Sequence, residues 1–289
     1  MNSLTQMIEM IIASPMLAIA LIGLFGLLVG SFLNVVIHRV PLMMEQEFKR
    51  ECEEYQSVEN PEETAPLTLS KPASHCPKCQ SKIRWYQNVP VVSWLYLRGK
   101  CAHCANPISF RYPLVEIISA VLSVAAYLHF GPTLQFLASL GLLYSLISLT
   151  GIDYDHQLLP DRITLPLCGA GLLLSAYFGW VTPTQSIYGA IGGFVSLWLV
   201  YKLFLLITGK HGMGYGDFKL LAALGAWLGV SQLPLIILLG SLIGSVIGVV
   251  MIRLNGASKP FAFGPSLAIG GIISLFFGQS IMQWYLGMY

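Results

Sequence analysis

The feature that most constrains the fold of this 289-residue chain is a series of apolar runs long enough to cross a membrane. A transmembrane helix needs about 20 predominantly apolar residues to span about 30 Å of hydrocarbon. Such runs occur at 16–37, 113–130, 134–152, 163–181, 187–207, 218–230, 233–252 and 263–286. Only Ser231 and Gln232 separate the short sixth run from the seventh, so these two runs can also form one broken helix. We predict an all-α polytopic membrane protein with about eight transmembrane helices.

The composition excludes other classes of protein. Hydrophobic residues make up 55% of the chain and charged residues only 10%, whereas soluble domains contain about 25% charged residues. No tract rich in Gly, Pro or Ser is long enough to indicate a disordered chain. Six cysteines are too few for a secreted protein held together by disulfides.

Positive charge is concentrated in one connecting segment. Ten of the 16 Lys and Arg residues lie between Arg39 and Arg111, and positively charged loops tend to stay in the cytoplasm. If the N-terminus lies outside, the other six all fall at cytoplasmic ends of spans: Arg162, Lys202, Lys210, Lys219, Arg253 and Lys259. We therefore expect this segment to be cytoplasmic and both termini to lie outside.

The spans and the charges together predict three domains. We expect 1–40 to be an N-terminal transmembrane anchor, 41–111 a cytoplasmic domain, and 112–289 a seven-helix membrane domain. No Lys or Arg precedes the first apolar run, and that run is too long for a cleavable signal peptide. We therefore expect the first segment to remain as an anchor.

Four cysteines in the cytoplasmic segment have the spacing of metal ligands. Cys76 and Cys79 form one C-x-x-C pair, Cys101 and Cys104 form a second, and residues 80–100 separate them. Four thiolates satisfy tetrahedral zinc at about 2.3 Å, although the separation slightly exceeds the usual range of about 15–20 residues. We predict a structural Zn²⁺ site, because four Cys ligands leave no open position for a reacting water.

Other interpretations of these cysteines are weaker. Disulfides are disfavoured in a reducing cytosol, and a single redox C-x-x-C pair would not explain the second pair. His75 and His103 stand beside the two pairs and are alternative ligands. Cys52 and Cys168 are expected to be ordinary thiols.

Acidic side chains are scarce in the membrane part of the chain. Its four aspartates occupy two stretches, Asp153, Asp155 and Asp161 in the first and Asp217 in the second. A carboxylate at membrane depth costs about 2.5–3.5 kcal/mol, so such residues are functional candidates. Asp153 directly ends an apolar run and Asp217 directly precedes one, both at predicted cytoplasmic ends, so the two can face one another.

Two neighbouring carboxylates favour acid and base chemistry. They do not both ionise easily, so one can act as a base towards water while the other donates a proton. We therefore predict that Asp153 and Asp217 form the pair of an aspartyl protease. Alternatives remain for the others: Asp155 can replace Asp153 as the partner, Asp161 follows Pro160 as a helix N-cap would, and Asp217 can also be a helix cap.

At these residues the chain resembles the bacterial type IV prepilin peptidases, which are bifunctional leader peptidases and N-methyltransferases of the GxGD aspartyl protease group. The resemblance covers nearly the whole chain. It rests on the two C-x-x-C pairs and on five further ordered stretches: 30–41 (GSFLNVVIHRVP), 111–116 (RYPLVE), 153–161 (DYDHQLLPD), 214–217 (GYGD) and 263–265 (FGP).

The resemblance implies a function and a site. Asp153 and Asp217 match the family's catalytic pair. The implied activity is cleavage of prepilin or type II secretion pseudopilin leaders at the cytoplasmic side of the bacterial inner membrane, between a glycine and usually a phenylalanine. Methylation of the new N-terminal amine by S-adenosylmethionine would follow. The expected partners are these substrates and the lipid bilayer, with no nucleic acid, and the oligomeric state is left open.

The methyl-donor site has no recognisable motif. The chain lacks a G-x-G-x-x-G loop followed by an acidic residue, so the cofactor-binding residues are not assigned. The family places methylation near the first membrane exit and the cytoplasmic loop, which makes candidates of Gly30, Asn34, His38, Arg39 and Glu116. Gly30 can equally be a helix-packing glycine.

Two other functional classes use the same residues differently. A proton-coupled transporter would use Asp153 and Asp217 as a relay. It predicts two similar halves, however, and the cysteine-containing loop has no counterpart in the second half. A zinc scaffold without activity would need the cysteines and would tolerate loss of the aspartates.

Overall fold

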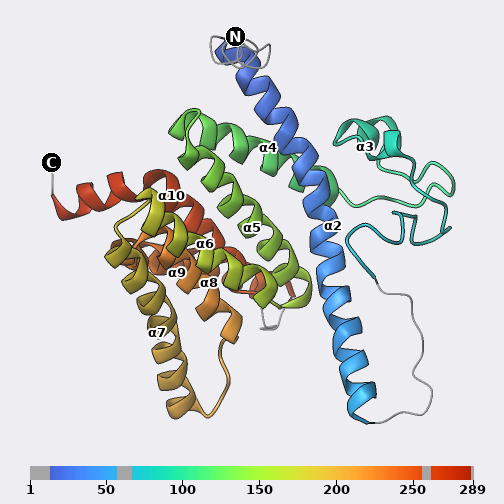
Figure 1. Cartoon of the computed structure of the whole chain (residues 1–289). Helices are drawn as coiled ribbons and strands as arrows, with labels where there is room; N and C mark the ends of the chain where they lie inside the picture. The colour runs from blue at the N-terminus through green and yellow to red at the C-terminus, as the bar shows by residue number, and fades with distance from the viewer. Residues whose placement is uncertain (1–13, 57–66, 256–261, 288–289) are drawn as a thin grey trace. The chain divides into compact units, whose positions relative to one another are not determined.

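The computed structural model describes residues 14–56, 67–255 and 262–287, and their regular elements are helices (Figure 1). The elements are α2 (Pro15–Tyr55), η1 (Trp85–Asn88), α3 (Val92–Tyr96), α4 (Arg111–Phe130), α5 (Leu134–His156), α6 (Asp161–Phe178), α7 (Pro183–Thr208), α8 (Tyr215–Leu228), η2 (Val230–Gln232), α9 (Leu233–Asn255) and α10 (Gly264–Leu286). Parts of all three predicted domains lie outside the described residues, namely 1–13, 57–66, 256–261 (with Lys259) and 288–289.

The chain divides into two compact units, Met1–Ser148 and Leu149–Tyr289, called unit 1 and unit 2 below. Helix α5 begins in unit 1, and its last turns from Leu149 onwards belong to unit 2. The three predicted domains were defined by expected function and by side of the membrane. A division by contacts tests neither, so these domains remain a prediction.

Six of the described helices are long and apolar enough to cross a membrane: α2, α4, α5, α7, α9 and α10. The prediction of eight spans is therefore not confirmed. Helix α8 has only 14 residues, which reach about 21 Å at 1.5 Å per residue. Helix α6 begins with the charged pair Asp161 and Arg162. The protein is a multi-pass membrane protein, and α8 and α9 are separate helices joined by η2.

In unit 1, α2 is one continuous helix that extends through Pro41 to Tyr55, well beyond the predicted span (Figure 1). It packs closely on α4 through two glycines four residues apart. A Cβ atom at Gly26 would lie 2.6 Å from Ala120 Cα, and one at Gly30 would lie 2.6 Å from Glu116 Cα. Small residues at this spacing let two membrane helices approach. Gly30 therefore has the packing role that the sequence left open.

In unit 2, α8 is buried among α6, α7 and α10 (Figure 1). Its backbone meets that of α7 at Gly225 and Gly189, where a Cβ on either residue would overlap the carbonyl oxygen of the other. Two polar contacts fix α8 further. Ser186 Oγ donates to the carbonyl of Ala226 at 2.6 Å, and Trp227 Nε1 donates to the carbonyl of Leu167 at 2.8 Å.

The close contact of α7 and α8 gives a testable expectation about stability. Gly225→Ala should lower the free energy of unfolding by about 1–3 kcal/mol, the usual cost of overpacking a well-packed core. Gly169→Ala on α6 is the matched control, because a Cβ at Gly169 meets no atom within 4 Å. Thermal unfolding in detergent measures the difference, and equal melting of both variants would contradict this packing.

Candidate functional site

Two buried carboxylates lie in unit 2. Asp153 is near the C-terminal end of α5 and Asp217 is in the first turn of α8. Their side chains belong to residues only 5% and 8% exposed. Leu159 lies beside Gly264, the backbone partner of Asp153, and beside Gly216, the residue before Asp217. The structure thus brings the two sequence-predicted residues together.

The Asp153 carboxylate is held by the start of α10. Its Oδ2 atom accepts a hydrogen bond of 2.9 Å from the backbone N–H of Gly264, the first residue of that helix. The first N–H groups of a helix have no partner within the helix, so they are available to an anionic side chain. A Cβ at position 264 would lie 2.5 Å from Asp153 Oδ2. Only glycine permits this close approach.

The Asp217 carboxylate is held by its own helix. Gly214 is the N-cap residue of α8, and the Asp217 side chain interacts with its backbone N–H, as the third helical residue does in a capping box. At Gly216 a Cβ would lie 2.7 Å from Leu159 Cβ. The buried side chain of Leu159 also lies 3.3 Å from the place of a Cβ at Gly264. Leu159 thus fills the space between the two glycines.

The other two aspartates lie elsewhere in unit 2. Asp155 is exposed. Both carboxylate oxygens of Asp161 lie 2.7 Å from Lys219 Nζ in a partly exposed ion pair. The predicted N-cap role of Asp161 is wrong, since the N-cap of α6 is Pro160 and no side chain caps this end. Asp161 is already the first helical residue, and its side chain reaches towards α8.

The segment before α8 is fixed by contacts that the sequence did not predict. The Tyr201 hydroxyl lies 2.7 Å from His211 Nδ1, and the Tyr201 ring packs against Tyr215 and Phe218. Tyr201 is buried on α7. This cluster anchors both ends of the loop that carries the two glycines before Asp217. In the sequence, only the presence of a tyrosine inside the apolar run 187–207 could have indicated this cluster.

Four cysteines of unit 1 form a cluster with the geometry of a metal site. The sulfur atoms of Cys76, Cys79, Cys101 and Cys104 all lie within 4.8 Å of one another. Among the described residues, neither neighbouring histidine belongs to this group of possible ligands. The four residues therefore fit a closed set of thiolate ligands.

The two cysteine pairs have matching local structures. The N–H of Cys76 donates to the carbonyl of Ser81, and the N–H of Cys101 donates to that of Asn106. Each turn contains one residue of positive φ, Gln80 at 57° and Ala105 at 55°. Each pair is therefore one tight knuckle, and the two knuckles present their sulfurs to a common point.

The surroundings of the thiols favour charged sulfur at part of the cluster. The Ser81 hydroxyl and then its backbone N–H lower the pKa of Cys79 to about 6. The backbone N–H groups of Cys104 and His103 lower the pKa of Cys101. The Asn106 N–H also favours the Cys104 thiolate, yet desolvation and the three neighbouring sulfurs raise the pKa of Cys104 to about 11. A bound cation would remove this repulsion between sulfurs.

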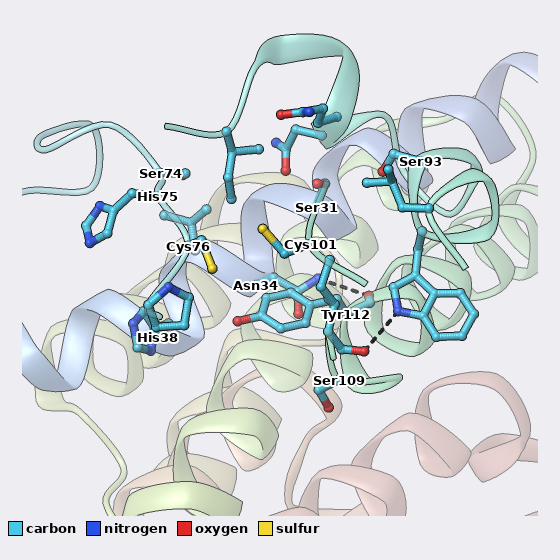
Figure 2. A pocket seen from close by; sticks show the side chains of 18 of the residues that line it. Ser31, Asn34, His38, Ser74, His75, Cys76, Ser93, Cys101, Ser109 and Tyr112 are labelled. Carbon is cyan, nitrogen blue, oxygen red and sulfur yellow. Dashed lines mark hydrogen bonds between the residues drawn. The ribbon is translucent and has the colours of Figure 1, made fainter. Parts of the chain in front are cut away.

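A cavity of about 580 Å³ lies in unit 1 beside the cysteine cluster (Figure 2). Its lining comes from α2, α4 and the segment between them. It includes four of the five candidate methyl-donor residues, namely Asn34, His38, Arg39 and Glu116, and it does not include Gly30.

Side chains from α2 and α4 hold the cavity walls in place. Arg39 donates to the carbonyls of Thr68 and Leu69 and, at 2.7 Å, to that of Pro72. Asn34 Nδ2 donates to the carbonyl of Tyr112 at 3.1 Å. Glu116 Oε2 accepts a hydrogen bond of 2.7 Å from the N–H of Val91.

The fold and the sites define a multi-pass membrane protein with a buried carboxylate pair in one unit and a metal-type cysteine cluster in the other. Two family models match the chain: residues 24–130 match the bacterial peptidase A24 N-terminal domain, and residues 140–249 match the type IV leader peptidase family. The chain belongs to the family of prepilin leader peptidases/N-methyltransferases, as the resemblance of its motifs implied.

Full-length relatives carry that description. A prepilin leader peptidase/N-methyltransferase of Aeromonas hydrophila is 49% identical over 286 residues, which cover 97% of this chain and 98% of the relative. Proteins with the same description from Pseudomonas aeruginosa and Neisseria gonorrhoeae are 47% and 46% identical, with coverage of 97% or more of both chains in each case. No solved structure matches the chain. The transporter alternative receives no support from any relative.

Proposed function

We propose that unit 2 cleaves the leader peptides of type IV prepilins and type II secretion pseudopilins with Asp153 and Asp217. The observation that carries this proposal is the pair itself: two buried carboxylates in unit 2, whose only other acidic residues are Asp155 and Asp161. Membership of the leader peptidase family supports the same activity.

The chemistry follows from one proton shared between two acids. The ionised member of the pair takes a proton from a water molecule, which attacks the scissile carbonyl carbon. The protonated member donates its proton to the carbonyl oxygen. The first member then gives the proton it took from water to the leaving amine, while the diol intermediate returns a proton to the second member as the carbon–nitrogen bond breaks. The Gly264 N–H orients the Asp153 carboxylate throughout. Each role needs a carboxylate, so an amide cannot replace either one.

The substrate and its orientation follow from the charge pattern. We place the segment from Arg39 to Arg111 in the cytoplasm of a bacterium, because ten of its residues are Lys or Arg and positively charged segments tend to stay inside. The protein would lie in the inner membrane, with both carboxylates towards the cytoplasmic side. A prepilin with a basic leader and an apolar stem would present its cleavage site, between a glycine and usually a phenylalanine, at that depth.

The cysteine cluster would hold a structural Zn²⁺ ion. Cys76, Cys79, Cys101 and Cys104 fit the four thiolate positions of a closed tetrahedral site. Such an ion supplies folding free energy and takes no part in hydrolysis, because it has no open position. The ion would join the two knuckles of the loop, which has little secondary structure of its own.

The second activity would be methylation of the amine that cleavage exposes. The methyl donor is S-adenosylmethionine, as the N-methyltransferase description of the relatives supports. The amine lone pair attacks the methyl carbon, the carbon–sulfur bond breaks with its electrons on sulfur, and the amine releases one proton to water.

A single mass-spectrometric experiment tests the proposed function. A purified prepilin is incubated with this protein in detergent and S-adenosylmethionine, and the product is weighed. We expect a product that has lost its leader and gained one methyl group. An intact prepilin after incubation with folded protein would contradict the peptidase, and would favour a zinc scaffold without activity. A cleaved product without the methyl group would contradict only the transferase.

The contact between Asp153 and Gly264 gives a more local expectation. In Gly264→Ala the added Cβ would lie 2.5 Å from Asp153 Oδ2, so the carboxylate must move from its place. We expect leader cleavage to fall by about 10²-fold, the effect of a displacement near 1 Å in a catalytic site. The control is Gly141→Ala on α5, where a Cβ meets no atom within 4 Å. Cleavage at the wild-type rate by Gly264→Ala would show that this contact does not position Asp153.

A further inference from the structure

The loop between α2 and α4 carries exposed aromatic and apolar side chains on its two short helices. Trp85 and Tyr86 begin η1, and their rings pack edge to face with centroids 5.9 Å apart. Val92, Leu95 and Tyr96 lie on α3 at positions i, i+3 and i+4, so they share one face of that helix. All five side chains are exposed, Trp85 by 84% and Tyr96 by 86%. These five residues are called the η1–α3 surface below.

The other side of α3 belongs to the interior of unit 1. Ser93, Trp94 and Leu97 line the cavity, together with Ser31 and Asn34 of α2. Helix α3 is thus held by the cavity on one side and presents large apolar side chains on the other. Exposed apolar patches of this kind mark surfaces that bind a membrane or a partner.

Helix α3 lies level with the end of two membrane-spanning helices. The N–H of Val91, the residue before α3, donates to Glu116 Oε2 at 2.7 Å. Glu116 is in the second turn of α4, a helix of 20 residues, which is about the length that spans the hydrocarbon core. A helical side chain points towards the N-terminus of its helix. The bond therefore places the start of α3 beside the first turn of α4, at the membrane surface.

The segment around the η1–α3 surface is positively charged. Residues 64–115 contain seven Lys and Arg residues and no Asp or Glu. Arg84 precedes η1 and Arg98 follows α3, and both are exposed. Four thiolates around Zn²⁺ would carry two negative charges, so the segment stays positive with its metal bound. Aromatic side chains combined with Lys and Arg are typical of segments that lie in the interface of an anionic membrane.

We propose that the η1–α3 surface docks on the bilayer that α2 and α4 cross, in contact with anionic phospholipid. Trp85 and Tyr96 enter the headgroup region, and Arg84 and Arg98 pair with lipid phosphates. Phospholipid fits this surface better than the basic leader of a prepilin does, because like charges repel. The docking holds the loop against the membrane from outside, whereas Glu116 holds it from within unit 1.

Fluorescence quenching on the full-length protein tests the docking. The protein is placed in nanodiscs of phosphatidylcholine and phosphatidylglycerol, with or without bromine atoms on the upper acyl chains, which quench tryptophan only at contact. The tryptophan introduced by Tyr96→Trp should lose at least about half of its emission to bromine, because interfacial apolar side chains reach about 5–10 Å into the boundary between headgroups and acyl chains. Its emission is the difference between the variant and wild type in the same lipid.

Tyr55→Trp is the matched control. Tyr55 is 92% exposed and is the last residue of α2, so it lies about 27 Å along the helix from Ile37 at 1.5 Å per residue. The tryptophan introduced there should emit equally with and without bromine. Wild type compared with Trp85→Phe reports the native side chain, which should be quenched as in Tyr96→Trp. Equal emission of Tyr96→Trp in brominated and ordinary lipid would overturn the docking.

The same nanodiscs test the role of the basic side chains. Quenching of Tyr96→Trp should weaken by about twofold or more when Arg84→Gln and Arg98→Gln are added, and likewise when phosphatidylglycerol is left out. The control pair Lys49→Gln/Arg50→Gln removes two basic residues from the part of α2 beyond Ile37 and should leave the quenching unchanged. Quenching that needs neither arginine nor phosphatidylglycerol would contradict the contact with anionic lipid.

A purified prepilin distinguishes a lipid from a protein occupant. Its addition should leave the quenching of Tyr96→Trp by brominated lipid unchanged. If the introduced tryptophan is not quenched by lipid, and its emission changes when prepilin is added, the surface binds the substrate and the proposal is wrong.

Discussion

Replacing either buried aspartate by asparagine is expected to abolish leader cleavage. In Asp153→Asn and Asp217→Asn the cleavage rate should fall by at least about 10³-fold, because an amide can neither take a proton from water nor exchange one with its partner. The side-chain volume hardly changes, so both variants should fold. The rate is measured from the fraction of a purified prepilin that loses its leader with time.

Asp155→Asn and Asp161→Asn are the matched controls for this experiment. Both residues lie in the same region, but Asp155 is exposed and Asp161 pairs with Lys219. They should retain cleavage within about threefold of wild type, as substitutions outside a reacting site usually do. If a folded variant of Asp153 or Asp217 still cleaves while Asp155→Asn does not, the pair has been assigned to the wrong residue.

Removing the cysteine ligands is expected to have the second-largest effect. The double variant Cys76→Ser/Cys101→Ser takes one thiol from each knuckle, and its bound metal should fall from about one equivalent per chain to a small fraction. Structural zinc sites supply about 10–16 kcal/mol of binding free energy that is also folding free energy. We therefore expect residues 67–110 to become sensitive to limited proteolysis.

Metal analysis of the purified, reduced protein decides this prediction. The control is Cys52→Ser/Cys168→Ser, which removes the two cysteines outside the cluster. It should keep its metal and its resistance to protease. Less than about half an equivalent of zinc in reduced wild-type protein would contradict the metal site, as would a cysteine double variant that keeps its metal.

The candidate residues of both sites could be selected from the sequence, because residues of these types are rare in the chain. Four aspartates near apolar runs and two C-x-x-C pairs offer few combinations. The structure buries both Asp153 and Asp217 in unit 2 and gathers the four sulfurs at one point. Rarity and spacing were sufficient to select these residues. Each aspartate lies at the end of the helix that positions it, and each cysteine pair forms its own turn.

The number of membrane spans could not be predicted as reliably as the candidate site residues. Helix α8 is apolar and almost completely buried against other helices of unit 2, whereas α6 buries few of its residues and exposes large apolar side chains such as Leu165 and Leu173. An apolar run reports burial, and it does not distinguish a lipid environment from a protein interior. Six of the described helices have the length and hydropathy of a membrane span, so the prediction of eight spans is not confirmed.

Contacts between distant residues were also beyond the sequence. The N–H of Gly264 donates to the carboxylate of Asp153, 111 positions earlier in the chain. The cavity of unit 1 is lined by residues of α2, of α4 and of the loop between these helices. The motif at 263–265 was noticed, but nothing in it names Asp153 as its partner. Likewise the sequence indicated that Asp161 caps a helix. Its carboxylate instead pairs with Lys219, which lies 58 residues away in the sequence.

The central claim is that Asp153 and Asp217 cut the leader and that methyl transfer does not depend on them. The most direct test supplies a pre-cleaved pilin and S-adenosylmethionine to folded Asp217→Asn protein and weighs the pilin by mass spectrometry. We expect the pilin to become one methyl group heavier, although the same variant leaves intact prepilin uncut. A folded variant that neither cuts nor methylates would contradict the claim, because both reactions would then depend on one site.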